Sequence, residues 1–134
     1  EAVLERRHRD LTAWITGQVE ARADDPASRL MIFFDVLGDW LESDDFRGCL
    51  FVRAVGELGL SHDAVCKAAT DHKQWYHRFF RDNAVAAGLT QADRLAGDLL
   101  LLTEGATTRV MVDGEGRGEA ERARRIAQML VTSG

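Results

Sequence analysis

The chain has 134 residues, of which 46% are hydrophobic and 29% are charged, and its net charge is −5 at neutral pH. This length suits one domain spanning residues 1–134, and this composition excludes wholesale disorder. The acidic balance argues against nucleic-acid binding by the chain alone, because phosphate contacts need clustered cations. The two cysteines cannot form a secreted disulfide scaffold. No apolar run approaches the ~18 residues of a membrane span, so we expect a cytoplasmic protein without a membrane partner.

The first half of the chain has the periodicity of helices. Apolar residues recur at steps of three and four over residues 3–22, which predicts an amphipathic helix with one exposed side. Asp25 is a suitable N-cap and Pro26 a suitable first residue for the next helix, which we expect over residues 26–42. That segment is apolar over most of its circumference, so we expect it to be buried among other helices.

The second half continues the helical pattern after a short predicted helix over residues 49–58. A long helix over residues 62–87 should end at Gly88, which suits the position after a helix C-terminus. Thr90 and Asp93 resemble a capping box and predict a helix over residues 90–112. Because so little chain separates these two helices, they should form an antiparallel hairpin.

A Gly-rich turn over residues 113–118 precedes a last predicted helix that ends near Val131. No segment shows the alternation of a strand. The sequence therefore predicts an all-α fold, a bundle of six helices without a sheet.

Two stretches of the chain resemble the regulatory domain of the TetR/AcrR family of bacterial transcriptional regulators. The first is LMIFFDVLGDWL over residues 30–41, followed by FRGCLF over residues 46–51. The second comprises DHKQW over residues 71–75 and the hairpin sequence AAGL over residues 86–89. The resemblance covers essentially the whole chain and implies a C-terminal ligand-binding and dimerisation domain.

The resemblance also implies a DNA-binding unit with a helix-turn-helix before the regulatory domain. Residues 1–22 resemble the linker helix that follows this unit, and the chain does not begin with Met. We therefore expect the chain to be a piece of a longer protein, which binds operator DNA only through the unit missing here. Its expected role is to sense an effector, as part of a repressor that leaves DNA when the effector binds.

The family's effector cavity implies a binding site between the middle helices, mostly apolar with a few polar groups. The expected ligand is a small hydrophobic or aromatic molecule with one or two hydrogen-bonding groups. His72 is the favoured polar contact, because a neutral imidazole can both donate and accept. The expected lining residues are Phe33, Phe34, Leu37, Trp40, Phe51, His72, Trp75, Tyr76, Phe79, Leu99, Leu102 and Thr103.

An alternative stays open for every residue of this set. Aromatic residues at helical spacing also form ordinary hydrophobic cores, and a histidine on an apolar face is often a satisfied core residue. The chain would then be a structural or dimerisation bundle whose interior is filled by its own side chains.

The last two helices are expected to pair with their copies in a homodimer, as the resemblance implies. Small residues allow close approach of helices, and apolar ones supply buried area for a self-complementary interface. The alternative is that these faces only close the core of one protomer. The expected interface residues are Ala106, Thr107, Val110, Met111, Ala120, Ala123, Ile126, Ala127 and Leu130.

Other chemistry finds little support. His62 and Cys66 share a helical spacing, but two ligands do not make a zinc site. The Gly-rich turn lacks the carboxylate that ends a calcium loop, since Arg124 holds that position. No nucleophile motif is present, and an enzyme is a distant alternative. We therefore expect no metal, no cofactor and no catalytic residues.

Overall fold

The computed structural model describes residues 2–44, 46, 62–112 and 114–133. This part of the chain contains five helices and no strand, which confirms the predicted all-α class. The predicted helix over residues 49–58 lies outside the described residues, so the predicted total of six is untested. The helices are α1 (Ala2–Arg22), α2 (Pro26–Leu41), α5 (His62–Ala86), α6 (Ala92–Val112) and α7 (Gly116–Ser133).

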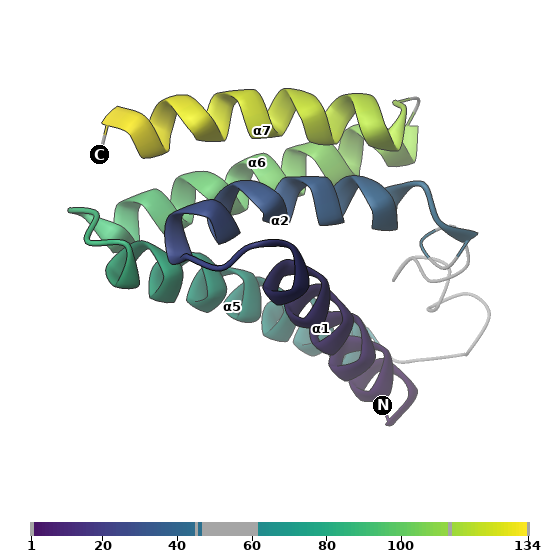
Figure 1. The fold of residues 1–134 in the computed structure, drawn as a ribbon. Coiled ribbons are helices and arrows are strands. Elements are labelled where there is room, and N and C mark those ends of the chain that lie inside the picture. Colours follow the sequence, from purple (N-terminus) through teal and green to yellow (C-terminus); the bar gives the residue numbers. More distant parts are fainter. Residues whose placement is uncertain (1, 45, 47–61, 113, 134) are drawn as a thin grey trace.

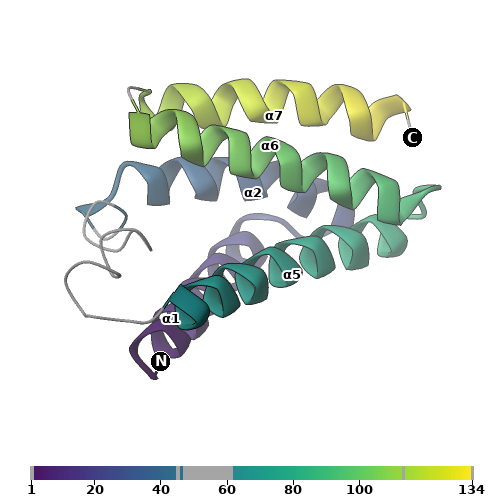
Figure 2. The same ribbon diagram turned by 180° about the vertical axis from the view of Figure 1, so that it is seen from behind.

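Helix α2 is the centre of the structure, since it contacts all four other described helices. Helices α6 and α7 lie on one side of it, while α5 and the obliquely crossing α1 lie on the other (Figure 1). The reverse view shows α5 and α6 as the neighbouring arms of a hairpin (Figure 2). The central position of α2 follows from its sequence, because the most apolar helix requires the most cover. The hairpin follows from the short connection between Ala86 and Ala92.

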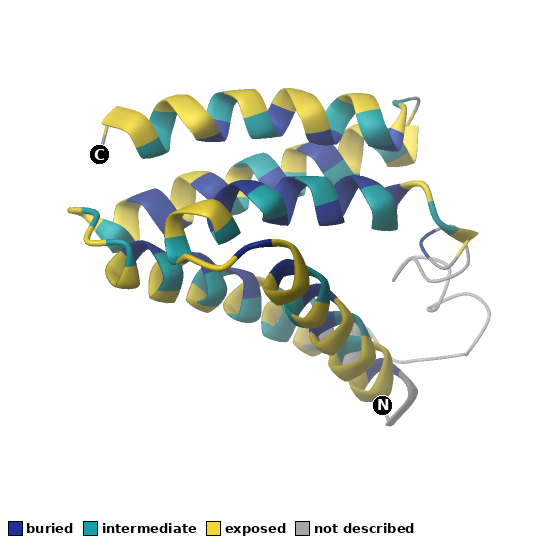
Figure 3. Cartoon of the chain, in the orientation of Figure 1, coloured by how far each residue is buried: buried dark blue, intermediate teal, exposed yellow. Residues whose placement is uncertain are grey.

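The burial pattern confirms the prediction for this central helix. Phe33 and Phe34 are fully buried, and buried residues run along the whole length of α2 (Figure 3). The ring centroid of Phe33 lies 4.7 Å from that of Phe80 in an edge-to-face arrangement. Such aromatic pairs add to the stabilisation that burial alone provides.

The predicted signals at the start of α2 and the end of α5 are confirmed. The Asp25 carboxylate accepts a hydrogen bond of 2.8 Å from the backbone N–H of Ser28, and Pro26 is the first helical residue. Gly88 takes a positive φ of 77°, where a side chain would be strained. The N–H of Leu89 then donates to the carbonyl of Ala84 over 3.0 Å, which caps α5.

The starts of the last two helices differ from the prediction. Helix α6 begins at Ala92, two residues later than predicted, because Gln91 takes a positive φ of 54° that a helix cannot contain. Helix α7 begins at Gly116, inside the segment predicted as a turn. A Cβ atom at Gly116 would lie 2.9 Å from the carbonyl carbon of Leu41, so glycine there permits close contact with the end of α2.

Candidate ligand cavity

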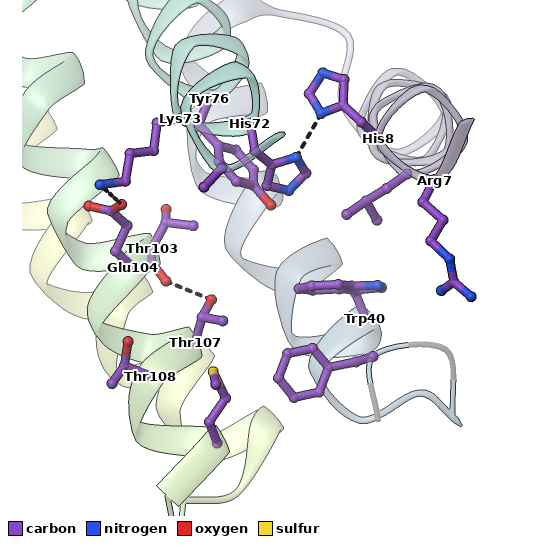
Figure 4. A pocket seen from close by; sticks show the side chains of 14 residues that line it. Arg7, His8, Trp40, His72, Lys73, Tyr76, Thr103, Glu104, Thr107 and Thr108 are labelled. Atoms are coloured by element: carbon purple, nitrogen blue, oxygen red, sulfur yellow. Dashed lines mark hydrogen bonds and ion pairs between the residues drawn. The ribbon is translucent and has the colours of Figure 1, made fainter. Parts of the chain in front are cut away.

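A cavity of about 320 Å³ opens where α1, the end of α2, the first half of α5 and the second half of α6 face one another (Figure 4). This volume lies at the small end of the range for ligand pockets in proteins. Its walls combine aromatic and aliphatic side chains with hydroxyl, imidazole and charged groups. The lining residues are Arg7, His8, Leu11, Trp40, Phe46, Ala69, His72, Lys73, Tyr76, Thr103, Glu104, Thr107, Thr108 and Met111.

Two histidines join α1 to α5 at the wall of this cavity. Nδ1 of His8 lies 2.8 Å from Nδ1 of His72, so one ring donates a hydrogen bond and the other accepts it (Figure 4). This bond requires at least one neutral ring. The ring of His72 also meets the ring of Tyr76 edge-to-face, with centroids 4.8 Å apart.

Burial keeps these groups uncharged at neutral pH. Desolvation, reinforced by the nearby His8, lowers the pKa of His72 to about 4. Desolvation also lowers the pKa of His8, against the opposing attraction of Asp71. Burial raises the pKa of Tyr76, so its hydroxyl keeps its proton.

The end of α2 and the segment that follows it supply an aromatic wall. Trp40 and Phe46 meet edge-to-face with centroids 4.8 Å apart, and both border the cavity. The indole N–H of Trp40 is buried without a hydrogen-bond partner. Buried donors are nearly always paired in proteins, so this group is an exception, but its nitrogen exposes almost no surface and is not open to the cavity.

Helix α6 supplies a polar wall, and three of its polar groups are already engaged. The Thr103 hydroxyl donates to the Leu99 carbonyl over 2.9 Å, and the Thr107 hydroxyl donates to the Thr103 carbonyl over 2.8 Å. Glu104 forms an ion pair with Lys73 of α5, with 3.2 Å between Nζ and Oε2. The two hydroxyls therefore present lone pairs rather than hydrogens to the cavity.

The structure distributes the twelve predicted lining residues over three environments. Trp40, His72, Tyr76 and Thr103 line the cavity together. Phe51 lies outside the described residues. The others belong to the core or pack against it: Phe33, Phe34, Leu37 and Leu99 are fully buried, and Trp75, Phe79 and Leu102 are partly buried.

The contribution of α1 to the cavity is not among the predictions from the sequence. Residues 1–22 are predicted as a linker helix, whereas in the structure Arg7, His8 and Leu11 line the cavity. Thr107 and Met111 line the cavity as well, although they were expected at a dimer interface. Helical periodicity shows that these residues share faces with core residues, but it does not show where neighbouring helices diverge.

The nine predicted interface residues include four that the chain itself covers. Ala106, Ala120, Ala123 and Ala127 are buried within the protomer. A Cβ atom at Gly38 of α2 would lie 3.1 Å from the Cβ of Ala120, so small residues bring α7 close to α2. Val110, Ile126 and Leu130 are partly buried. The outward faces of α6 and α7 instead expose other large apolar residues, namely Leu101, Val112 and Met129.

Comparisons of the chain with family models, curated protein sequences and solved structures find no match. Within the described ranges, no helix is long and apolar enough to cross a membrane. The same residues contain no group of three or more His, Cys, Asp or Glu side chains placed to hold a metal ion.

Proposed function

We propose that this chain is the effector-sensing and dimerisation domain of a bacterial TetR-like transcriptional regulator. In this proposal a small hydrophobic or aromatic molecule binds the cavity and releases the repressor from its operator. The DNA contacts belong to a unit that would precede residue 1 in a longer protein. The resemblance of residues 30–41 and 46–51 to that family is the sequence argument for it.

The observation that carries the proposal is the position of the cavity against α1. A ligand in this cavity touches α1 as well as α2, α5 and α6, because Leu11 and His8 form part of the wall. A molecule that binds one arrangement of these helices better than another shifts the population toward that arrangement. Helix α1, the expected link to a DNA-binding unit, would thereby transmit the change.

The histidine pair gives this transmission a specific contact. His8 of α1 and His72 of α5 are both cavity residues, and they are bonded to each other over 2.8 Å. A ligand that competes for His72 weakens the bond to His8, and a ligand that leaves His72 in place preserves it. The two helices can therefore be held or released from inside the cavity.

The proposed homodimer uses the outward faces of α6 and α7. Leu101 and Val112 are 70% and 77% exposed, so they offer apolar surface that a partner could cover. A Cβ atom at Gly97 or Gly105 would meet nothing within 4 Å, so these glycines have no packing role within the protomer. A second copy approaching this face would bury the leucine and valine side chains.

Native mass spectrometry of the purified chain tests both parts of the proposal. We expect a dimer that carries a co-purified or added small apolar molecule. Ala69→Trp should fill the cavity and abolish ligand retention, since Ala69 lines it. Ala21→Trp places the same side chain on an exposed position of α1 and should retain the ligand.

The outcomes separate the alternatives. A monomer at micromolar concentration contradicts the dimer. If both tryptophan variants retain the ligand equally, binding takes place elsewhere and the cavity is not the sensor. If no molecule from a broad apolar library binds the parent chain, a structural bundle is the better description.

A further inference from the structure

The charged and ionisable groups of the cavity indicate what charge its ligand can carry. Lys73 is already paired with Glu104, and His72 is neutral because burial lowers its pKa to about 4. Arg7 is exposed, and its guanidinium lies at the edge of the group of side chains in Figure 4. An ion that enters this cavity loses water and gains no buried countercharge, which is unfavourable. The cavity therefore suits an uncharged molecule.

The hydroxyl of Tyr76 indicates which polar group such a molecule needs. Tyr76 is only 5% exposed, lines the cavity, and points its hydroxyl toward the space between α5 and Trp40 (Figure 4). Its ring contacts are to aromatic neighbours, and within the described part of the chain its hydroxyl has no hydrogen-bond partner. A hydroxyl that faces a cavity and has no partner in the chain can donate to an acceptor on a bound molecule.

Two of the three threonine hydroxyls that line the cavity do not compete for that acceptor. Thr103 and Thr107 donate their hydrogens to backbone carbonyls of their own helix. The indole N–H of Trp40 also lacks a partner, but its nitrogen exposes almost no surface and points away from Tyr76 and α6 (Figure 4). The Tyr76 hydroxyl, which faces the cavity without a partner, therefore favours a ligand with a hydrogen-bond acceptor beside it.

The aromatic residues set the shape. Trp40, Phe46 and Tyr76 present ring faces and edges to a space of about 320 Å³. Planar aromatic molecules make offset or edge-to-face contacts with such rings, which add to the gain from burial. This volume suits a molecule of one to a few rings rather than a peptide.

We propose that the cavity binds an uncharged planar aromatic molecule that carries a carbonyl oxygen, and that the Tyr76 hydroxyl donates a hydrogen bond to this oxygen. The inference rests on the proposed function, because it specifies the effector of that same cavity. It assigns Tyr76 as the residue that discriminates between ligands, where His72 had been the favoured contact.

Three probes of equal ring size test this assignment by calorimetric titration of the full chain: 2-acetylnaphthalene, 2-isopropenylnaphthalene and 2-naphthoate. The ketone should bind roughly 3- to 10-fold more tightly than the hydrocarbon, which is the range that one net hydrogen bond provides. The naphthoate anion should bind at least about tenfold more weakly than the ketone. Tyr76→Phe should remove the preference for the ketone and leave hydrocarbon affinity unchanged.

Two controls accompany that variant. Tyr76→Phe removes a hydroxyl without a partner, so its unfolding midpoint in urea should match that of the parent chain. Thr16→Val removes a hydroxyl of α1 that is bonded to the Thr12 carbonyl and lies outside the cavity. It should bind all three probes as the parent chain does.

The outcomes distinguish this inference from the proposed function. Equal affinity for ketone and hydrocarbon, an unchanged ketone affinity in Tyr76→Phe, or tighter binding of naphthoate overturns the inference and leaves a ligand cavity in place. If none of the three probes binds at millimolar concentration, the inference fails, and the sensing function fails with it only when the broad apolar library also yields no ligand.

Discussion

The two ends of α2 lie in different surroundings. At its start, which we call the packed end, Leu30, Phe33 and Phe34 are fully buried against residues such as Phe80. At its finish, which we call the cavity end, Trp40 borders an open space instead. The same apolar stripe thus serves as core at one end and as cavity wall at the other. A residue of this stripe belongs to the core where α1 and α5 pack closely against α2. It belongs to the cavity wall where these helices diverge from α2.

The largest expected difference between the ends is in stability. Leu30→Ala at the packed end should lower the free energy of unfolding by about 2–5 kcal/mol, because it leaves a cavity among fixed neighbours. Leu11→Ala at the cavity end removes the same atoms from a partly exposed side chain that already borders open space. It should cost less than half as much in urea denaturation followed by circular dichroism. Equal losses would mean that the cavity end is packed as tightly as the core.

A second difference is sensitivity to pH, which should reside at the cavity end. The folded pKa of His72 is about 4, below its ordinary value of 6.5, so the unfolded chain binds more protons between these values. The stabilisation is therefore fully present above pH 6.5 and is lost as the pH falls toward 4. The loss should approach about 2–3 kcal/mol for a group this buried.

A comparison of variants isolates this contribution from that of the carboxylates. His72→Asn should flatten the stability profile between pH 7 and pH 4, measured as the urea midpoint at each pH. His8 should contribute in the same direction, since desolvation lowers its pKa despite Asp71, and Arg78 and Lys67 lower it further. His77 does not line the cavity, so His77→Asn serves as the control. Parallel profiles for parent and His72→Asn would contradict the prediction.

The structure of the packed end could be predicted from the sequence, whereas that of the cavity end could be predicted only in part. The 3.6-residue period and the caps at Asp25 and Gly88 identify helices and their inner faces, and these were correctly predicted. Four of the predicted lining residues, Trp40, His72, Tyr76 and Thr103, border the same cavity. Periodicity cannot separate a wall from a core, because both are apolar faces of helices. The predicted lining set therefore includes Phe33 and Leu99, which lie in the core. It lacks His8, whose position at the cavity depends on how α1 crosses α5.

A third prediction concerns the close contact that holds α7 on α2. Gly116→Ala should destabilise the fold by about 1–3 kcal/mol, because its Cβ would lie 2.9 Å from the Leu41 carbonyl carbon and 3.0 Å from the Glu42 nitrogen. Backbone atoms cannot move aside as a flexible side chain can. Gly17→Ala in α1 is the matched control, since its Cβ would meet nothing within 4 Å. It should stabilise the chain by roughly 0.5–1 kcal/mol, as expected for alanine in a helix interior.

The smallest expected effect comes from the ion pairs beside that same contact. Arg117 of α7 donates to Asp39 over 2.7 Å and to Glu42 over 3.0 Å, and Arg22 of α1 donates to Asp39 over 2.7 Å. Burial alone would raise the pKa of Asp39, but the hydrogen bonds from Arg117 and Arg22 lower it below the usual value. These carboxylates thereby connect α2 to the helices on both of its sides.

Arg117→Met should nevertheless cost less than about 1 kcal/mol, because the Arg117 side chain is 42% exposed and solvent screens the pair. The loss should shrink in 1 M NaCl, where exposed charges are screened within about 3 Å. Urea denaturation at low and high salt measures both quantities. A loss comparable to that of Gly116→Ala would mean that charge holds α7 in place. A small, salt-sensitive loss would instead show that close helix packing does so, and that the network only orients the end of α2 where the cavity begins.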